Sequence, residues 1–395
     1  MTKNPKDADT NIKQTKNEEI EAFLREHYNF RFNTVKSRAE YCLIGEGTFH
    51  IINKIFINSI CRKLDHEANI LTSFYNINSI LESDFLKNVN PIQEYFRHLP
   101  QKEGVDAITR LASTVVVKNS GHWLEYLTKW LVGVIANALN NEGCQNHVCL
   151  VLTGDQGLFK TTWLDHLCPD SLKSYRYTGK VDPQNKDVLT LLAECLFINI
   201  DDQLKFLNKR NENDLKNMIT TPSVKYRRPY DVYIEEYPHI ASFMASVNGN
   251  DFLTDPTGSR RFLPFEVLYI DISVTKGIKM DDVYSEAMFM YVNNFRYWFK
   301  DSEIYELHRQ SSAFYVQTIE FEILMDYFEQ PDENELDNYF MTTAHIINYL
   351  SERVSLRLSN KKMGESLKKS GYIRKSKRVN GMPVYGWFIK PIESK

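Results

Sequence analysis

A phosphate-binding sequence pattern constrains this chain more than any other feature. Residues 148–162 read VCLVLTGDQGLFKTT, an apolar run that leads through a glycine-containing loop to Lys160 and Thr161. A buried strand, a glycine-containing loop and a helix start, in that order, are the parts of a P-loop. Backbone N–H groups and the helix dipole of such a loop face the phosphates of a nucleotide. The pattern therefore predicts an α/β domain that binds a nucleoside triphosphate.

The predicted loop assigns a role to each of its residues. Lys160 supplies a positive charge to the phosphates, and Thr161 offers a hydroxyl group to Mg²⁺. The residues expected to bind ATP are Gly154, Asp155, Gln156, Gly157, Leu158, Phe159, Lys160, Thr161 and Thr162. Phe159 stands where the usual form has a glycine that allows close backbone approach to the phosphates. A buried strand, a turn and a helix with a surface lysine is the alternative interpretation.

Length and composition limit the fold and the partners. A chain of 395 residues is expected to form two or three domains, and 43% hydrophobic residues suffice for packed cores. The net charge of −3 gives no overall signature of nucleic-acid binding, so DNA contacts would come from local basic patches. The six cysteines are scattered without a C-x-x-C pair, which favours reduced thiols in a cytoplasmic protein. No apolar run approaches the ~20 residues of a membrane span.

Apolar spacing divides the chain into five segments. Residues 1–17 are polar and are expected to form a disordered tail. Residues 18–143 have mostly helical spacing and predict a helical N-terminal region. Residues 144–320 alternate short apolar runs, such as ECLFINI and IASFMASV, with helical stretches, which predicts a mostly parallel sheet. Residues 321–340 are expected to be an acidic linker, and residues 341–395 a small winged helix-turn-helix domain.

The last segment is basic and has the element order of a winged helix. Thr342 or Thr343 can cap a first helix, and a second helix is expected over residues 361–369. Two strands follow, over residues 372–378 and 383–389, joined by an Asn-Gly hairpin signal. The side chains expected to contact nucleic acid here are Lys361, Lys362, Lys368, Lys369, Lys375, Lys377 and Arg378.

Two carboxylates follow the next predicted strand after the phosphate loop. A P-loop enzyme needs one acid near Mg²⁺ and a second to orient the attacking water. The segment LFINIDDQ supplies Asp201, the predicted Mg²⁺ ligand beside Thr161, and Asp202, the predicted catalytic acid. A strand end capped by two solvated acids is the alternative.

An amide and two arginines complete the predicted catalytic set. Asn248 follows the strand SFMASV, where its side chain can polarise the attacking water or sense the terminal phosphate. Arg260 and Arg261, in TGSRRF, can stabilise charge on the transferred phosphoryl group, often from an adjacent subunit. A surface pair at the start of a strand is the alternative for these arginines.

Residues 224–240 predict a β-hairpin with a basic and aromatic tip. Such a tip has the chemistry to follow a nucleic-acid backbone and to stack bases. Its side chains expected to contact nucleic acid are Lys225, Arg227, Arg228 and Tyr230. A surface hairpin charged only for solubility is the alternative.

Together these motifs resemble the virulence-associated protein E family, P-loop proteins of bacterial mobile elements and prophages that are similar to superfamily 3 helicases. The resemblance rests on GDQGLFKTT, FINIDDQ, RRPY and ASVNGNDFLTDPTGSRRF, and it covers roughly residues 91–267. It implies an AAA+-like ATPase core that uses ATP and Mg²⁺ and assembles as a ring, expected to be a hexamer, around DNA.

The resemblance also implies a role for each motif. Lys160 and Thr161 correspond to Walker A, and Asp201 with Asp202 to Walker B. Asn248 corresponds to sensor 1. Arg261, or its neighbour Arg260, corresponds to the arginine finger, and residues 224–237 to the DNA-translocating hairpin.

The expected function is that of an ATP-dependent DNA helicase or translocase for replication of a mobile element. Phe159 favours a rival, a nucleotide-regulated, non-catalytic DNA-binding or initiator protein. An ATPase used in anti-phage defence by the mobile element shares the chemistry and is the third hypothesis. Turnover with and without single-stranded DNA separates the first two.

Overall fold

The computed structural model describes most of the chain. The described residues are 15–102, 106–183, 185, 187–207, 209–228, 232–254, 259–316, 318–331, 339–379 and 382–392. They divide into two compact units, a first unit of residues 1–249 with 257–311 and a second unit of residues 250–256 with 312–395. Most of the predicted tail, residues 1–14, lies outside the described residues. Its end is helical, because Thr15 caps a helix that begins at Lys16.

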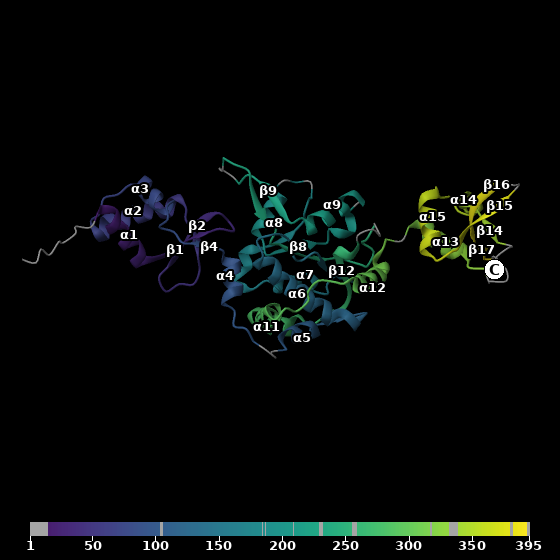
Figure 1. Ribbon diagram of the computed structural model, residues 1–395, viewed down its shortest axis with the longest axis horizontal. Helices are drawn as coiled ribbons and strands as arrows, with labels where there is room; N and C mark the ends of the chain where they lie inside the picture. Colours follow the sequence, from purple (N-terminus) through teal and green to yellow (C-terminus); the bar gives the residue numbers. More distant parts are fainter. Residues whose placement is uncertain are drawn as a thin grey trace, which may run out of the picture. The chain divides into compact units, whose positions relative to one another are not determined.

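The beginning of the first unit combines three helices with a small sheet (purple in Figure 1). The helices are α1 (Lys16–His27), α2 (Lys54–Ala68) and α3 (Phe74–Leu81). The strands are β1 (Tyr28–Asn33), β2 (Arg38–Leu43), β3 (His50–Ile51) and β4 (Asn88–Val89), in the order β3-β2-β1-β4. The prediction of a purely helical region over residues 18–143 is therefore wrong. The segment YNFRFN alternates aromatic and polar residues with a period of two, which suits a strand.

The rest of the predicted N-terminal region belongs to the central core. Its elements are α4 (Pro91–His98), α5 (Ala107–Ser113), β5 (Val115–Val117), η1 (Ser120–His122) and α6 (Trp123–Leu139). α6 is buried along nearly its whole length, and its Trp130 and Leu131 are inaccessible to solvent. These residues share one hydrophobic core with the central sheet. The expected boundary at residue 143 therefore does not separate two packed bodies.

The central sheet has six strands in the order β5-β12-β6-β11-β8-β7. Its further strands are β6 (Cys149–Thr153), β7 (Arg176–Gly179), β8 (Phe197–Asp201), β11 (Ser242–Ser246) and β12 (Phe262–Ile270). These five run parallel, and β5 pairs antiparallel with β12. The prediction of a mostly parallel sheet is confirmed. We call the side on which β6, β8 and β11 end the carboxyl edge, and the side on which β6 and β12 begin the amino edge.

Helices and a hairpin surround this sheet (Figure 1). They are α7 (Lys160–His166), η2 (Asp170–Tyr175), α8 (Val188–Glu194), η3 (Leu204–Phe206), α9 (Lys209–Thr220), η4 (Ser259–Arg261), α10 (Ile272–Gly277), α11 (Met280–Val292) and α12 (Asp301–Ser311). The predicted hairpin is present as β9 (Ser223–Tyr226) and β10 (Glu235–Pro238). Residues 229–231, which come between these two strands in the sequence, lie outside the described residues.

The second unit has its own core around Leu324, Ile346 and Leu367 (yellow-green in Figure 1). Its elements are η5 (Ser312–Phe314), α13 (Ile319–Tyr327), β13 (Phe328–Glu329), β14 (Phe340–Met341), α14 (Thr343–Ser351), α15 (Asn360–Lys369), β15 (Arg374–Val379), β16 (Met382–Phe388) and β17 (Lys390–Pro391). The predicted order of helix, helix and two-stranded hairpin is present, and Thr342 is the residue that caps α14. The prediction of a linker over residues 321–340 is wrong over α13, since Leu324 of this helix is buried. Residues 332–338 lie outside the described residues.

Within the described part of the chain, no helix combines the length and the apolar character that crossing a membrane would require.

Candidate functional site

The loop predicted to bind phosphate connects β6 to α7 at the carboxyl edge. Gly154 has φ +129°, and a Cβ atom there would stand 2.6 Å from the carbonyl oxygen of Val267. Gly157 has φ +90°, a conformation that side chains rarely adopt. The path of the loop therefore requires glycine at both positions. Of the other predicted loop residues, Leu158 is half-buried and packs on the central core; the exposed ones are Asp155, Gln156, Phe159 and Thr162.

Lys160 is buried although it carries a charge, with 5% of its surface exposed. Its Nζ donates to the carbonyl oxygens of Gly154 at 3.0 Å and Asp155 at 2.6 Å, and to Oδ1 of Asn248 at 3.3 Å. Burial lowers the pKa of Lys160, and the nearby carboxylates, Asp202 first, oppose that shift. These three acceptors are neutral oxygens that fix the ammonium group without cancelling its charge. The positive charge would therefore stabilise an anion bound beside it.

A hydroxyl–carboxylate cluster lies next to the lysine. Thr161 Oγ1 donates to Oδ1 of Asp201 at 2.8 Å, and Ser246 Oγ donates to the same oxygen at 2.7 Å. The two hydroxyl oxygens are 3.0 Å apart. The three residues come from α7, β8 and β11, and carboxylate and hydroxyl oxygens are the ligand type that Mg²⁺ prefers. Sequence reasoning missed Ser246, although it ends the strand that precedes Asn248.

Asp202 and Asn248 are joined through the backbone. The N–H of Asn248 donates to Oδ1 of Asp202 at 3.1 Å, and the N–H of Asp202 donates to the carbonyl oxygen of Ser246 at 3.0 Å. Lys205, a residue that the sequence analysis did not single out, places Nζ 3.4 Å from the carbonyl oxygen of Asn248. The structure thus brings Lys160, Thr161, Asp201, Asp202 and Asn248 together at the carboxyl edge. The donor set fits a magnesium-bound triphosphate.

The two predicted arginines lie elsewhere. Phe262, the residue after Arg261, pairs with Cys149, the first residue of β6. Arg260 and Arg261 therefore lie at the amino edge, whereas the phosphate loop follows the carboxyl end of β6. Within one chain the arginines are not brought to Lys160.

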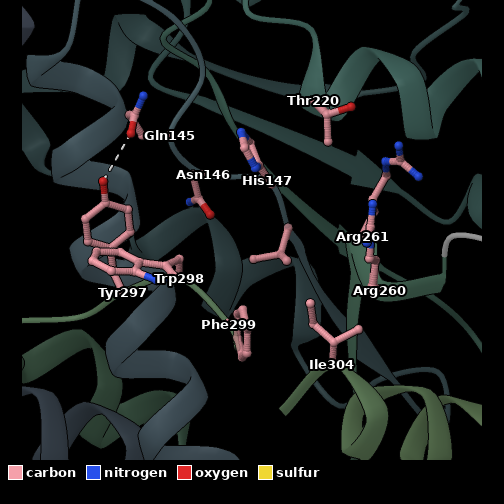
Figure 2. Close-up of a pocket in the computed structure, with 11 residues that line it drawn as sticks. Gln145, Asn146, His147, Thr220, Arg260, Arg261, Tyr297, Trp298, Phe299 and Ile304 are labelled. Atoms are coloured by element: carbon pink, nitrogen blue, oxygen red, sulfur yellow. Dashed lines mark hydrogen bonds between the residues drawn. The ribbon is translucent and has the colours of Figure 1, made fainter. Parts of the chain in front are cut away.

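A pocket of about 390 Å³ opens beside these arginines (Figure 2). We call it the arginine pocket; its lining residues are Gln145, Asn146, His147, Val148, Thr220, Arg260, Arg261, Tyr297, Trp298, Phe299 and Ile304. Nε of Arg261 is buried without a hydrogen-bond partner among the described residues. Burial, and then the charge of Arg260, lower the pKa of Arg261. The Tyr297 hydroxyl donates to Oε1 of Gln145 at 3.2 Å and holds one wall.

Glu303 fixes the aromatic wall of the arginine pocket. Its carboxylate accepts two hydrogen bonds from Arg296, at 2.6 and 2.7 Å, and one from the backbone N–H of Lys300 at 2.7 Å. It also accepts from Lys129 of α6 at 2.5 Å. The hydrogen bonds from Arg296 hold the pKa of Glu303 well below its usual range. The segment that carries Trp298 is thereby tied to both α12 and α6.

Glu303→Gln is expected to lower the free energy of unfolding of the first unit by about 2 kcal/mol, because it leaves Arg296 without its carboxylate partner and the buried Lys129 with Glu125 alone. Differential scanning calorimetry should show a midpoint lower by about 3 °C. Since folding lowers the pKa of Glu303, the difference from the wild-type protein should be full at pH 7. It should shrink as the pH falls below about 4, where the unfolded carboxylate binds a proton. Glu306→Gln, on the same helix, removes a surface pair with Arg309 and should leave the midpoint close to that of the wild-type protein. Equal losses in both variants would contradict the assignment.

The prediction that Arg228 of the hairpin contacts nucleic acid is wrong. Arg228 is buried, donates to the carbonyl oxygen of Val35 at 3.0 Å and lies over the ring of Tyr237. It ties the hairpin to the beginning of the chain and is not available to DNA. Lys225 and Arg227 are exposed, and Lys225 pairs with Glu236 at 3.2 Å. Tyr230 lies outside the described residues.

Exposed apolar side chains, which were not predicted as contacts, follow the turn of the hairpin. They are Val232, Tyr233 and Ile234.

The basic residues of the second unit that were predicted to contact nucleic acid lie on α15 and β15. Lys361, Lys362 and Lys368 of α15 are exposed, whereas the side chain of Lys369 lies outside the described residues. The exposed cations of β15 are Lys375, Lys377 and Arg378. Arg374, a residue the sequence analysis left out of the contact set, places its guanidinium 5.5 Å from the ring centre of Tyr385. These positions leave the cations accessible to a partner.

Comparisons with known proteins agree with this architecture. A family model, the virulence-associated protein E-like domain, matches residues 97–316. Two solved structures of the NrS-1 C terminal region are similar in fold. An apo structure has a TM-score of 0.52 and 9% identity, covering 96% of this chain and 100% of that chain. An A form apo structure has a TM-score of 0.50 and 10% identity, covering 94% of this chain and 99% of that chain. No curated protein matches the chain.

Proposed function

Because the chain belongs to the virulence-associated protein E-like family, which is matched over more than half of its length, we propose that it is an ATP-driven helicase or translocase that acts on DNA during replication of a mobile element. One observation carries the proposal. Lys160, Thr161 and Asp201 converge at the carboxyl edge with Asp202 and Asn248, although they come from distant parts of the sequence. Phosphoryl transfer needs such a set of one fixed cation, one hydroxyl–carboxylate pair and one polar group for water.

Each residue at the carboxyl edge has a role in this proposal. Lys160 holds the terminal phosphates, and Asp202 with Asn248 orients the attacking water. Thr161 and Asp201 would hold Mg²⁺, which would supply positive charge to the phosphates. Ser246 keeps Asp201 in position through the hydrogen bond to its Oδ1.

Assembly into a ring would complete the site. Arg261 lies at the amino edge, and a head-to-tail contact pairs the amino edge of one copy with the carboxyl edge of the next. In such a ring, expected to be a hexamer, Arg261 of one copy acts on the triphosphate held by its neighbour. Its buried and unpartnered Nε supports this role, because an anion would satisfy it.

The hairpin and the second unit are the proposed contacts with DNA. Lys225 and Arg227 would follow the phosphate backbone, and Tyr233 offers an exposed ring for stacking. The second unit, interpreted as a winged helix, would add the exposed cations of α15 and β15.

Reversing the charge of Lys225 and Arg227 together to Glu is expected to weaken binding of single-stranded DNA by at least about tenfold at low salt. The slope of log K against log salt concentration should become shallower by about 1.4 units, because two phosphate contacts are lost. Binding should be measured by fluorescence anisotropy across a salt series. Lys173→Glu is the control, because Lys173 is an exposed lysine that forms a surface pair with Asp170. Equal affinity of the hairpin variant and the wild-type protein would remove the hairpin from the path of the DNA.

The experiment that tests the function is ATP turnover with and without single-stranded DNA. A translocase should hydrolyse ATP and accelerate in the presence of DNA. Phe159, which is exposed within the loop, favours a second candidate, a nucleotide-regulated DNA-binding switch. The switch should bind ATP and DNA without DNA-stimulated turnover, and a protein that binds no ATP would refute both.

A further inference from the structure

Phe159 occupies a backbone position that suits glycine. Its φ is +58°, in the left-handed region, where a bulky side chain is uncommon and carries a conformational cost. The residue is 55% exposed, so packing within the chain offsets little of that cost. A large apolar side chain that is strained and exposed at a functional loop calls for a partner outside the chain.

The arginine pocket has the chemistry to receive this loop. Trp298 is 57% exposed on one wall, and Arg260 and Arg261 form another (Figure 2). The aromatic wall is held in place by Glu303, so it is available without rearrangement. The complementary surface would present an apolar aromatic side chain to pack on the aromatic wall. Beside it, that surface would present carboxylates or phosphates to pair with the two cations.

The phosphate loop presents that complement at the carboxyl edge. Phe159 precedes Lys160, and Asp155 stands exposed in the same loop. The carboxyl and amino edges lie on opposite sides of the sheet, so one copy cannot join them. A head-to-tail contact between two copies pairs two different surfaces and brings these edges together.

We infer that the occupant of the arginine pocket is the phosphate loop of a second copy of this chain, with Phe159 packed against Trp298. The inference rests on the proposed ring, and it adds the contact that sets the register between neighbours. Packing of Phe159 brings the triphosphate held by Lys160 toward Arg260 and Arg261. In this inference, Phe159 stands where the usual loop has glycine because its side chain stabilises the contact between neighbouring copies.

Phe159→Gly separates this role from nucleotide binding. Glycine fits the left-handed backbone and removes bulk beside the phosphates, so the dilute subunit should bind an ATP analogue more tightly than the wild-type protein. Self-association with the analogue and Mg²⁺ should weaken by at least about tenfold, which corresponds to about 1.4 kcal/mol per contact. Sedimentation velocity measures association, and calorimetric titration below the association range measures nucleotide binding.

Trp298→Ala tests the other side of the contact. It should weaken association by a similar factor and leave nucleotide affinity of the dilute subunit at the wild-type value. The double variant should associate no more weakly than either single variant, because both remove one contact. Tyr75→Ala is the control. Tyr75 is an exposed aromatic residue of α3, which belongs to neither the phosphate loop nor the arginine pocket, so this variant should associate like the wild-type protein.

Each other result overturns the inference. If Phe159→Gly binds nucleotide more weakly in the dilute subunit, the phenyl group of Phe159 contacts the nucleotide of its own chain instead of a neighbouring copy. If association is unchanged in Phe159→Gly or Trp298→Ala, the two residues do not meet. A wild-type protein that binds no ATP would refute the proposed function. Association of the wild-type protein, Phe159→Gly and Trp298→Ala is therefore also compared without nucleotide, where weaker association of both variants would still support the contact and equal association would overturn it.

Discussion

Lys160→Ala is expected to reduce ATP turnover by at least about 100-fold, because removing one preorganised charge from a phosphoryl-transfer site costs about that much. Lys160 is buried, and two carbonyl oxygens and the Asn248 side-chain oxygen fix its ammonium group at the phosphate loop. Lys205 contacts Asn248 from its carbonyl side and cannot replace it without a movement of η3. Turnover should be measured at saturating ATP with single-stranded DNA present.

The control for this variant is Lys173→Ala. Lys173 is exposed on η2 and pairs with the surface carboxylate Asp170, so turnover should equal that of the wild-type protein. Thermal unfolding of both variants should show that the fold is retained. A Lys160→Ala protein that folds and keeps substantial turnover would contradict the assignment of the phosphate loop.

The sequence predicted the carboxyl edge well because local patterns place residues at strand ends. Apolar runs that end in Thr153, Asp201 and Ser246 are the strands β6, β8 and β11, and parallel strands end on one side of a sheet. The polar residues that follow must then lie near one another. The family resemblance drawn from these same motifs is confirmed by the family model.

Other features depend on tertiary contacts that no local pattern records. Arg228 looks like a basic hairpin residue, but Val35, nearly two hundred positions earlier, supplies the carbonyl group that buries it. Ser246 contacts Asp201 only because β11 lies between β6 and β8 in the sheet, an order that the sequence does not record. The first sheet was missed because YNFRFN is short and lies beside long helical stretches that dominate the apolar periodicity.

Arg261→Ala is expected to leave ATP binding within about twofold of the wild-type protein and to reduce turnover by about 1,000-fold, the effect of losing an arginine supplied to a phosphoryl-transfer site. Binding survives because Lys160 and Thr161 are at the other edge of the same chain. Arg261→Lys should restore little, since a lysine cannot reproduce the planar fork of the guanidinium. Arg260→Ala separates the two arginines; a larger loss in that variant would move the finger assignment to Arg260.

Mixing two inactive variants tests whether the arginine acts between copies. A Lys160→Ala subunit keeps Arg261, and an Arg261→Ala subunit keeps Lys160. In a head-to-tail ring assembled from equal amounts of the two variants, about one quarter of the contacts between neighbours join an intact phosphate loop to an intact arginine. Turnover should therefore recover to about one quarter of the wild-type rate, although neither variant alone is active. A mixture that stays inactive while it assembles would show that Arg261 serves its own chain or the fold, because only an arginine supplied by a neighbour can be complemented in this way.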